Sequence, residues 1–206
     1  MILKARHHVF IYPFFMRYAV FITKRYFRKV NVIGNIDDKG LPILIIANHI
    51  SWWDGFWIAY LNETLFLRKF HFMMLEEQLR KYWFFNYAGG FSVRKGSRTV
   101  VETLRYTSEL LQNSGNLVLV FPQGEIQSMH DQHFVFEKGI ERVIPNRHSV
   151  QVIMVANLVD YFSQKKPSLT MYLEEYTNSV SDHHALEARY NAFYKECVTN
   201  QSLRIE

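Results

Sequence analysis

The chain has 206 residues, and its 24 Lys and Arg against 19 Asp and Glu give a formal charge of +5. A hydrophobic share of 49% with 17 Phe, 12 Tyr and 4 Trp excludes a disordered chain, and one cysteine, Cys197, excludes an intrachain disulfide. The length suits a single domain with a sizeable core, and the basic balance leaves anionic lipid, nucleic acid and phosphorylated molecules as candidate partners.

The first predicted element is an aromatic, basic helix over residues 9–27. Phe14, Tyr18 and Phe21 recur at helical spacing, whereas Arg17 interrupts an apolar run that is too short for a transmembrane span. No small-residue cleavage site follows, so we do not expect a signal peptide. Aromatic residues together with the cations of residues 24–29 favour an amphipathic helix that lies at the surface of an anionic membrane. The alternative is a helix packed on the domain, with its long cationic side chains extended to solvent.

Beyond residue 29, strand patterns alternate with helix patterns. This alternation predicts an α/β fold with a mixed, mostly parallel sheet flanked by helices. No repeat or linker divides the chain, so we expect one domain over residues 30–206 after the N-terminal segment 1–29. The expected strands lie at 43–47, 70–74, 117–121, 150–155 and 169–173, and the expected helices at 54–61, 76–87, 97–112 and 185–198.

A histidine and an aspartate follow the first buried strand. His49 comes two residues after Ala47, and Asp54 lies where the next helix is expected to begin. A spacing of five residues in one straight helix would place the two side chains about 140° apart, so they meet only if the chain turns between strand and helix. A carboxylate that orients an imidazole makes that imidazole a general base. A buried histidine beside a helix-capping aspartate is the alternative for an isolated pair.

Three further segments carry polar residues that suit a binding site. Residues 89–95 place Arg94 and Lys95 just after a pair of glycines, which suits an anion-binding loop or an ordinary solvated one. Residues 121–125 follow a predicted strand, and strand ends are where α/β sheets bind ligands. His130 and His133 lie three residues apart, but without an obvious third ligand we interpret them as loop residues and expect no metal site.

These segments, taken in order, resemble the glycerolipid acyltransferase family, which includes the lysophosphatidic acid acyltransferases. Asn48-His49-x4-Asp54 is similar to the family's N-H-x4-D motif. Residues 90–94, Gly-Phe-Ser-Val-Arg, are similar to a glycine-aromatic stretch that ends in arginine, and residues 121–124, Phe-Pro-Gln-Gly, to the F-P-E-G motif. Residues 136–139 resemble an F-K-x-G-like element, and residues 152–156 stand where an apolar strand motif is expected. The resemblance covers residues 30–160.

The resemblance implies transfer of a fatty acyl group from acyl-CoA or acyl-carrier protein to a hydroxyl of a lysophospholipid or another lipid. His49 would remove the hydroxyl proton and Asp54 would orient His49, without a metal, a covalent intermediate or a cofactor other than the acyl donor. The N-terminal helix adds the expectation of peripheral attachment to the cytoplasmic face of the cell membrane. The implied substrate-binding residues are Asn48, Arg94, Lys95, Phe121, Pro122, Gln123, Gly124, Glu125 and Lys138.

The chain departs from the family pattern in its third motif. Gln123 stands where the family usually has Glu, and Glu125-Ile126 stand where Thr-Arg often follows. The missing arginine weakens the case for a phosphate-bearing acceptor, although Arg94, Lys95, Arg98 and Lys138 are available to replace it. We therefore leave the headgroup of the acceptor open.

Three other functions are compatible with parts of the sequence. A nucleic-acid-binding protein is disfavoured because no helix-turn-helix, zinc or RNP-like pattern is present. A hydrolase is disfavoured because the chain lacks a G-x-S-x-G motif. A catalytically inactive lipid-binding protein of the same fold is the main alternative, and the intact His49 and Asp54 argue against it.

Overall fold

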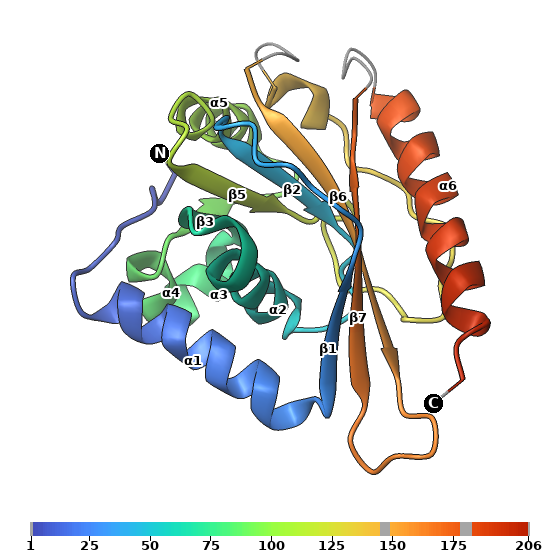
Figure 1. Cartoon of the computed structure of the whole chain (residues 1–206). Helices are drawn as coiled ribbons and strands as arrows, with labels where there is room; N and C mark the ends of the chain where they lie inside the picture. The colour runs from blue at the N-terminus through green and yellow to red at the C-terminus, as the bar shows by residue number, and fades with distance from the viewer. Residues whose placement is uncertain (1, 145–148, 178–182, 206) are drawn as a thin grey trace.

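The computed structural model describes residues 2–144, 149–177 and 183–205. Its centre is a seven-stranded sheet with the order β1-β7-β6-β2-β5-β3-β4 (Figure 1). Strands β6 and β7 pair in antiparallel fashion and the other neighbours are parallel, which confirms the predicted mixed, mostly parallel sheet. The strands are β1 (Lys29–Ile33), β2 (Ile43–Ala47), β3 (Lys69–Leu75), β4 (Gly90–Val93), β5 (Asn116–Val120), β6 (Gln151–Asp160) and β7 (Ser168–Glu175).

Helices flank this sheet, as predicted. The prediction of one helix over residues 76–87 is wrong. The segment forms two short helices, because the backbone of Tyr82 leaves the helical region between them. The helices are α1 (Ile11–Tyr26), α2 (Asp54–Leu61), α3 (Glu76–Lys81), α4 (Phe84–Tyr87), α5 (Thr99–Leu110) and α6 (His183–Ser202), with a π-helical turn η1 (Asn62–Phe66) and a 3-10 turn η2 (Ile140–Arg142).

Two strands were not predicted. β4 falls in the segment interpreted as a glycine loop, and Gly90 begins the strand rather than ending a helix. β1 is short and largely exposed, and it is held by parallel pairing with β7. Both strands are held by partners far away in the sequence, which a local pattern does not report.

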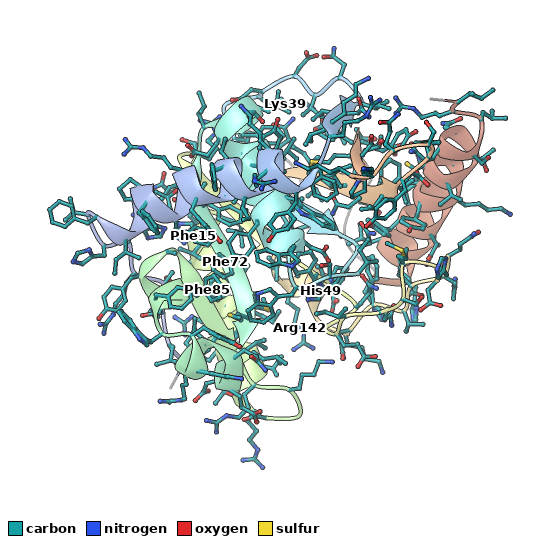
Figure 2. The ribbon with its side chains drawn as sticks, turned by 90° about the horizontal axis from the view of Figure 1, so that it is seen from below. Phe15, Lys39, His49, Phe72, Phe85 and Arg142 are labelled. Atoms are coloured by element: carbon teal, nitrogen blue, oxygen red, sulfur yellow. The ribbon has the colours of Figure 1, made fainter. Side chains whose placement is uncertain are left out.

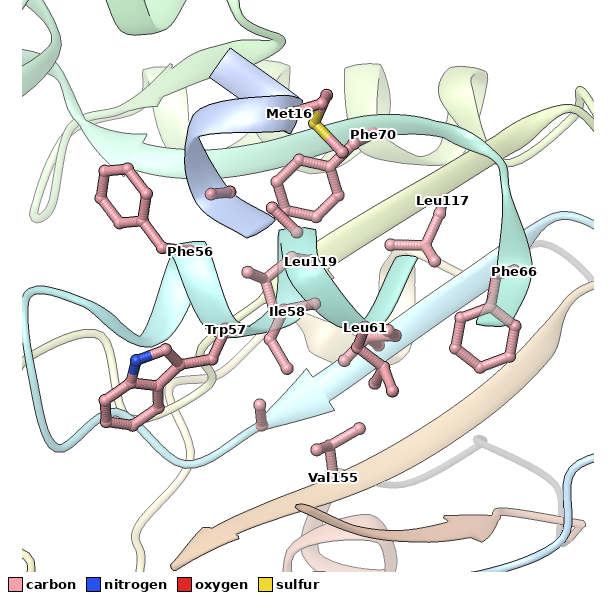
Figure 3. Packing of buried hydrophobic residues seen from close by; sticks show 14 of the residues in the cluster. Met16, Phe56, Trp57, Ile58, Leu61, Phe66, Phe70, Leu117, Leu119 and Val155 are labelled. Atoms are coloured by element: carbon pink, nitrogen blue, oxygen red, sulfur yellow. The ribbon is translucent and has the colours of Figure 1, made fainter. Parts of the chain in front are cut away.

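The two faces of the sheet are both covered. Every residue of β2 and β5 is buried, as expected for parallel strands between two helical layers. On one face, Ile43 and Ile45 pack with α1 and α2, and Figure 3 shows the aromatic and aliphatic side chains of this layer. On the other face, Leu44 and Ile46 pack with α6 and the segment around Phe134.

Helix α1 packs on the domain along one side and exposes aromatic residues on the other. Phe15, Met16 and Ala19 are buried where the helix packs against α2. Phe14 and Phe21 on the opposite side are 68% and 61% exposed. Within the described ranges, no helix has both the length and the apolarity that a membrane crossing requires.

The residues that precede α1 are bound along β4. The backbone N–H of Ser92 donates to the carbonyl of Leu3 at 2.9 Å, and the N–H of Gly89 donates to the carbonyl of Arg6 at 3.1 Å. This path places the ring of His7 against that of His71, with 4.6 Å between ring centroids. Burial, together with the neighbouring His7, lowers the pKa of His71 from 6.5 to about 3.

The buried imidazole of His71 makes stability depend on pH. The folded state keeps this ring neutral while the unfolded chain binds a proton, so stability is present above pH 6.5 and is lost on acidification towards pH 3. We expect His71→Leu to remove a slope of up to about 1.4 kcal/mol of unfolding free energy per pH unit in this window. Urea unfolding as a function of pH measures it, and His130→Gln, at an exposed loop histidine, is the control. An identical slope in wild type and His71→Leu would contradict the assignment.

Candidate active site

The ends of two neighbouring strands bring the first and third motifs together. β2 and β5 are parallel and adjacent, so the residues after Ala47 and Val120 emerge at the same edge of the sheet. The ring of Phe121 stacks on the ring of His49, with 4.1 Å between centroids and an angle of 9° between planes. His49 thus has a fixed aromatic neighbour on one face, while its side chain keeps 21% of its surface exposed.

His49 and Asp54 meet across the turn between β2 and α2. Nδ1 of His49 lies 2.9 Å from Oδ2 of Asp54. The same carboxylate oxygen accepts the backbone N–H groups of Ile50 at 2.6 Å and Ser51 at 2.9 Å. With Nδ1–H donated to Asp54, the lone pair of Nε2 is available as a base. The chain therefore turns as the sequence requires if the two side chains are to cooperate.

The Asp54 carboxyl group is fully buried. Burial raises its pKa above the ordinary value, and hydrogen bonds from His49 and from the two backbone N–H groups oppose this shift. The carboxylate therefore carries little surrounding water, and its charge acts mainly on the imidazole. A positive imidazolium beside it is stabilised more strongly than it would be in water.

Gln123 holds the backbone of His49 in place. Its side chain is buried, and Oε1 accepts the backbone N–H of His49 at 2.7 Å. Its Nε2 donates to Oε1 of Gln127 at 2.7 Å, and the N–H of Gln127 donates to the carbonyl of His49 at 2.9 Å. Both backbone polar groups of His49 are therefore bound by the loop that follows β5. The side chain at position 123 supports the histidine through neutral hydrogen bonds.

Asn48 links the same strand end to β6. Its Oδ1 accepts the N–H of Asn157 at 2.8 Å and its Nδ2 donates to the carbonyl of Asn157 at 3.0 Å. The side chain is fully buried, so its amide is used to fix the backbone that leads into His49.

The predicted cationic residues occupy different places. Arg94 pairs with the carboxylate of Glu76 at 2.8 Å. Lys95 lies at the wall of a cavity and pairs with Glu137 at 3.0 Å. Lys138 lines the same cavity and makes no ion pair with any residue that the structure describes. Lys95 and Lys138 are therefore the predicted cations that face the interior of the site.

The absence of a side chain at Gly124 lets the Lys95 side chain pass close to the backbone of the third motif. Its φ of +70° is in the left-handed region, and a Cβ atom there would lie 2.8 Å from Cε of Lys95. A side chain at this position would be strained and would also displace the lysine. Pro122 and Glu125, the remaining residues of the motif, line the cavity beside it.

A cavity of about 550 Å³ extends from His49 into the helical layer that contains α1. Its inner walls are aromatic, and Phe15, Phe72 and Phe85 lie close to one another, with ring centroids about 6 Å apart (Figure 2). These residues were not predicted as part of the site. Cavity-lining and core side chains have the same apolar periodicity, so no signal in one sequence separates them. Among the described residues, no group of three or more His, Cys, Asp or Glu is arranged to hold a metal ion.

Comparison with known proteins gives matches of two kinds. The family model described as Acyltransferase matches residues 23–172. A solved structure, that of the 1-acyl-sn-glycerophosphate (LPA) acyltransferase PlsC from Thermotoga maritima, superposes with a TM-score of 0.66 at 20% sequence identity. The match covers 94% of this chain and 80% of the other. The search of curated proteins finds no match.

Because the Asp54 carboxylate is buried, we expect its negative charge to reduce the stability of the folded state at neutral pH. Its raised pKa means that the folded state favours the protonated form, so stability present below the ordinary pKa of 3.8 is lost as pH rises through the folded value. Asp54→Asn keeps an acceptor oxygen for the turn and removes the charge. We expect this variant to unfold at an equal or higher temperature near neutral pH, with the difference vanishing in acid.

Thermal unfolding by calorimetry at neutral and acidic pH checks this expectation. A gain of about 1 kcal/mol corresponds to roughly 2–4 °C for a chain of this length. Asp38→Asn is the control, since Asp38 is an exposed carboxylate paired with Arg68. A clear loss of stability confined to Asp54→Asn at neutral pH would show that the ionised carboxylate is a net stabilising group.

Proposed function

Since this chain belongs to the acyltransferase family, we propose that it transfers a fatty acyl group from a thioester to a hydroxyl of a lipid acceptor. The thioester is acyl-CoA or acyl-carrier protein, and the acceptor is a lysophospholipid or a related lipid alcohol. The observation that carries the proposal is the bond between His49 and a buried carboxylate, at the wall of a large apolar cavity. This arrangement provides a base beside space for a hydrocarbon chain.

In the proposed reaction, Nε2 of His49 takes the proton of the acceptor hydroxyl as its oxygen attacks the thioester carbonyl. The resulting imidazolium is stabilised by the carboxylate of Asp54. When the tetrahedral intermediate collapses, the carbon–sulfur bond breaks and the imidazolium returns its proton to the thiolate. The products are an ester and a thiol, and His49 is regenerated without a covalent enzyme intermediate.

The apolar cavity suits the hydrocarbon chain of the acyl donor. Phe15, Phe72 and Phe85 form a wall away from His49, so a chain that enters with its carbonyl at the histidine would run towards them. Each buried methylene contributes about 0.8 kcal/mol, which is sufficient to position a thioester with a long chain. The cavity walls would then limit the length of the chain.

The charges in the cavity support an acceptor with an anionic or a strongly polar headgroup. Lys138 is available, whereas Lys95 is partly neutralised by Glu137. The neutral Gln123 is occupied by the backbone of His49, and Arg94 by Glu76. Because of these contacts, fewer unpaired cations face the cavity than the number of Lys and Arg residues in the motifs suggests. We therefore propose that the acceptor is not restricted to lysophosphatidic acid.

The exposed side of α1 suits peripheral binding to the cytoplasmic face of the cell membrane. Phe10, Phe14 and Phe21 project from this side, and Lys24 and Arg25 follow in the last turn. Helix α4, which packs beside α1, adds the exposed Phe84, and Trp83 just before this helix is also exposed. Aromatic rings at the headgroup level with cations facing anionic lipid would place the helix in the plane of the interface.

Loss of the imidazole tests the proposed reaction. We expect His49→Ala to reduce transfer of labelled acyl chains from acyl-CoA to a mixture of lysophospholipids by roughly a thousandfold or more. His133→Ala, at an exposed loop histidine, is the matched control and should retain full activity. Product lipids are quantified by mass spectrometry. Equal, low transfer by wild type and both variants would instead favour a lipid-binding protein without this activity.

Loss of exposed aromatic residues tests membrane attachment. We expect Phe14→Ser with Phe21→Ser to weaken partitioning onto anionic phosphatidylglycerol vesicles by at least about tenfold, because each ring contributes roughly 1.5–3 kcal/mol of apolar burial. Co-sedimentation at low salt measures it. Val135→Ser with Leu203→Ser removes two side chains of similar exposure, 64% and 76%, away from α1 and should have no effect. Equal partitioning of both double variants would refute this orientation.

A further inference from the structure

A second apolar pocket, of about 410 Å³, lies beside the turn that carries His49 and Asp54. It is bounded by the C-terminal half of α1, the start of α2 and the hairpin between β6 and β7. Phe27 and Trp57 are buried in its wall, whereas Trp53 and Tyr161 are 39% and 59% exposed. The pocket therefore has an apolar interior and an aromatic entrance.

The second pocket and the large cavity share one short segment of chain. His49, Trp52 and Phe56 line the large cavity, whereas the residue that follows each of them, Ile50, Trp53 and Trp57, lines the second pocket. Figure 3 shows Phe56 and Trp57 leaving α2 in different directions. The turn that holds the catalytic pair is therefore a partition with an apolar space on each side.

The loop after β5 continues this partition. Ile126 lines the large cavity and Met129 lines the second pocket, and between them the N–H of Gln127 donates to the carbonyl of His49. A ligand in either space therefore contacts a segment that is bonded directly to the proposed base.

The second pocket also contains a polar atom without a partner. Thr23 is 1% exposed, lines the pocket, and its hydroxyl has no hydrogen-bond partner among the described residues. A buried hydroxyl that is left unpaired costs about 1–3 kcal/mol. The hydroxyl therefore gives the otherwise apolar pocket one polar position.

The walls of the pocket are held together independently of any ligand. Nζ of Lys166, in the β6–β7 hairpin, donates to the carbonyl of Arg25 at 2.9 Å. The N–H of Arg28 donates to the carbonyl of Pro167 at 2.9 Å. These bonds fix the hairpin against the end of α1, so the pocket is preformed.

We propose that this second pocket binds the hydrocarbon chain that the lipid acceptor already carries. This inference rests on the proposed acyl transfer, in which two hydrocarbon chains must approach one histidine. The donor chain occupies the large cavity, the acceptor chain occupies the pocket on the other side of the turn, and the acceptor hydroxyl reaches His49 between them. The enzyme then selects its acceptor by the chain as well as by the headgroup.

Tryptophan fluorescence tests occupancy without requiring catalysis. The four tryptophans are Trp52, Trp53, Trp57 and Trp83, and only the middle two line the second pocket. In the Trp52→Phe, Trp83→Phe background, we expect lysophosphatidic acid with a brominated stearoyl chain to quench the remaining fluorescence. Adding Thr23→Phe, which fills the pocket, should weaken the apparent affinity at least about tenfold, whereas the isosteric Thr23→Val should change it much less. Absence of quenching, or quenching that Thr23→Phe leaves unchanged, would overturn the proposal.

Steady-state kinetics tests the same pocket during turnover. We expect Thr23→Phe to raise KM for an oleoyl lysolipid at least about tenfold and to leave KM for its hexanoyl analogue and for acyl-CoA within about twofold. A uniform loss with all three substrates would overturn the assignment. If no variant transfers acyl groups but the brominated lipid still quenches through Thr23-dependent binding, the proposed reaction fails while the binding site stands.

Discussion

The site depends on the way the buried carboxylate of Asp54 closes the turn between β2 and α2. One oxygen accepts two backbone N–H groups and faces Nδ1 of His49, so the same carboxylate shapes the chain and orients the imidazole. The ordered strand before the turn and the helix after it make this geometry possible. Because the carboxylate is surrounded by protein, structural and chemical roles cannot be separated at this residue.

Residues of the neighbouring motifs support this turn. Asn48 and Gln123 use their amides on backbone groups of β6 and of His49, and Phe121 covers one face of the imidazole. A neutral amide at position 123 holds the histidine backbone without placing a second negative charge beside the Asp54 carboxylate. The buried side chain at position 123 thus supports the histidine without carrying a charge.

Elements whose apolar residues recur with a regular period were predicted from the sequence. The pair of residues proposed for catalysis was predicted as well. β2 and α2 were predicted with their observed limits, and the meeting of His49 with Asp54 followed from the turn between them. β1 and β4 were missed because pairing with distant strands forms them. The cavity was missed because Phe15, Phe72 and Phe85 resemble ordinary core residues. The partner of Gln123 was missed because it is a backbone N–H, which every position offers.

The segment that runs along β4 has a consequence for the behaviour of the chain in solution. β4 is the last strand of the sheet, and its free edge would otherwise offer unpaired backbone groups to another molecule. Leu3 and Arg6 bond to Ser92 and Gly89 along that edge, and Ile2 is buried beside them. Residues ahead of α1 therefore act as a cover against intermolecular strand pairing. Such a cover would lower the tendency of the folded chain to aggregate at high concentration.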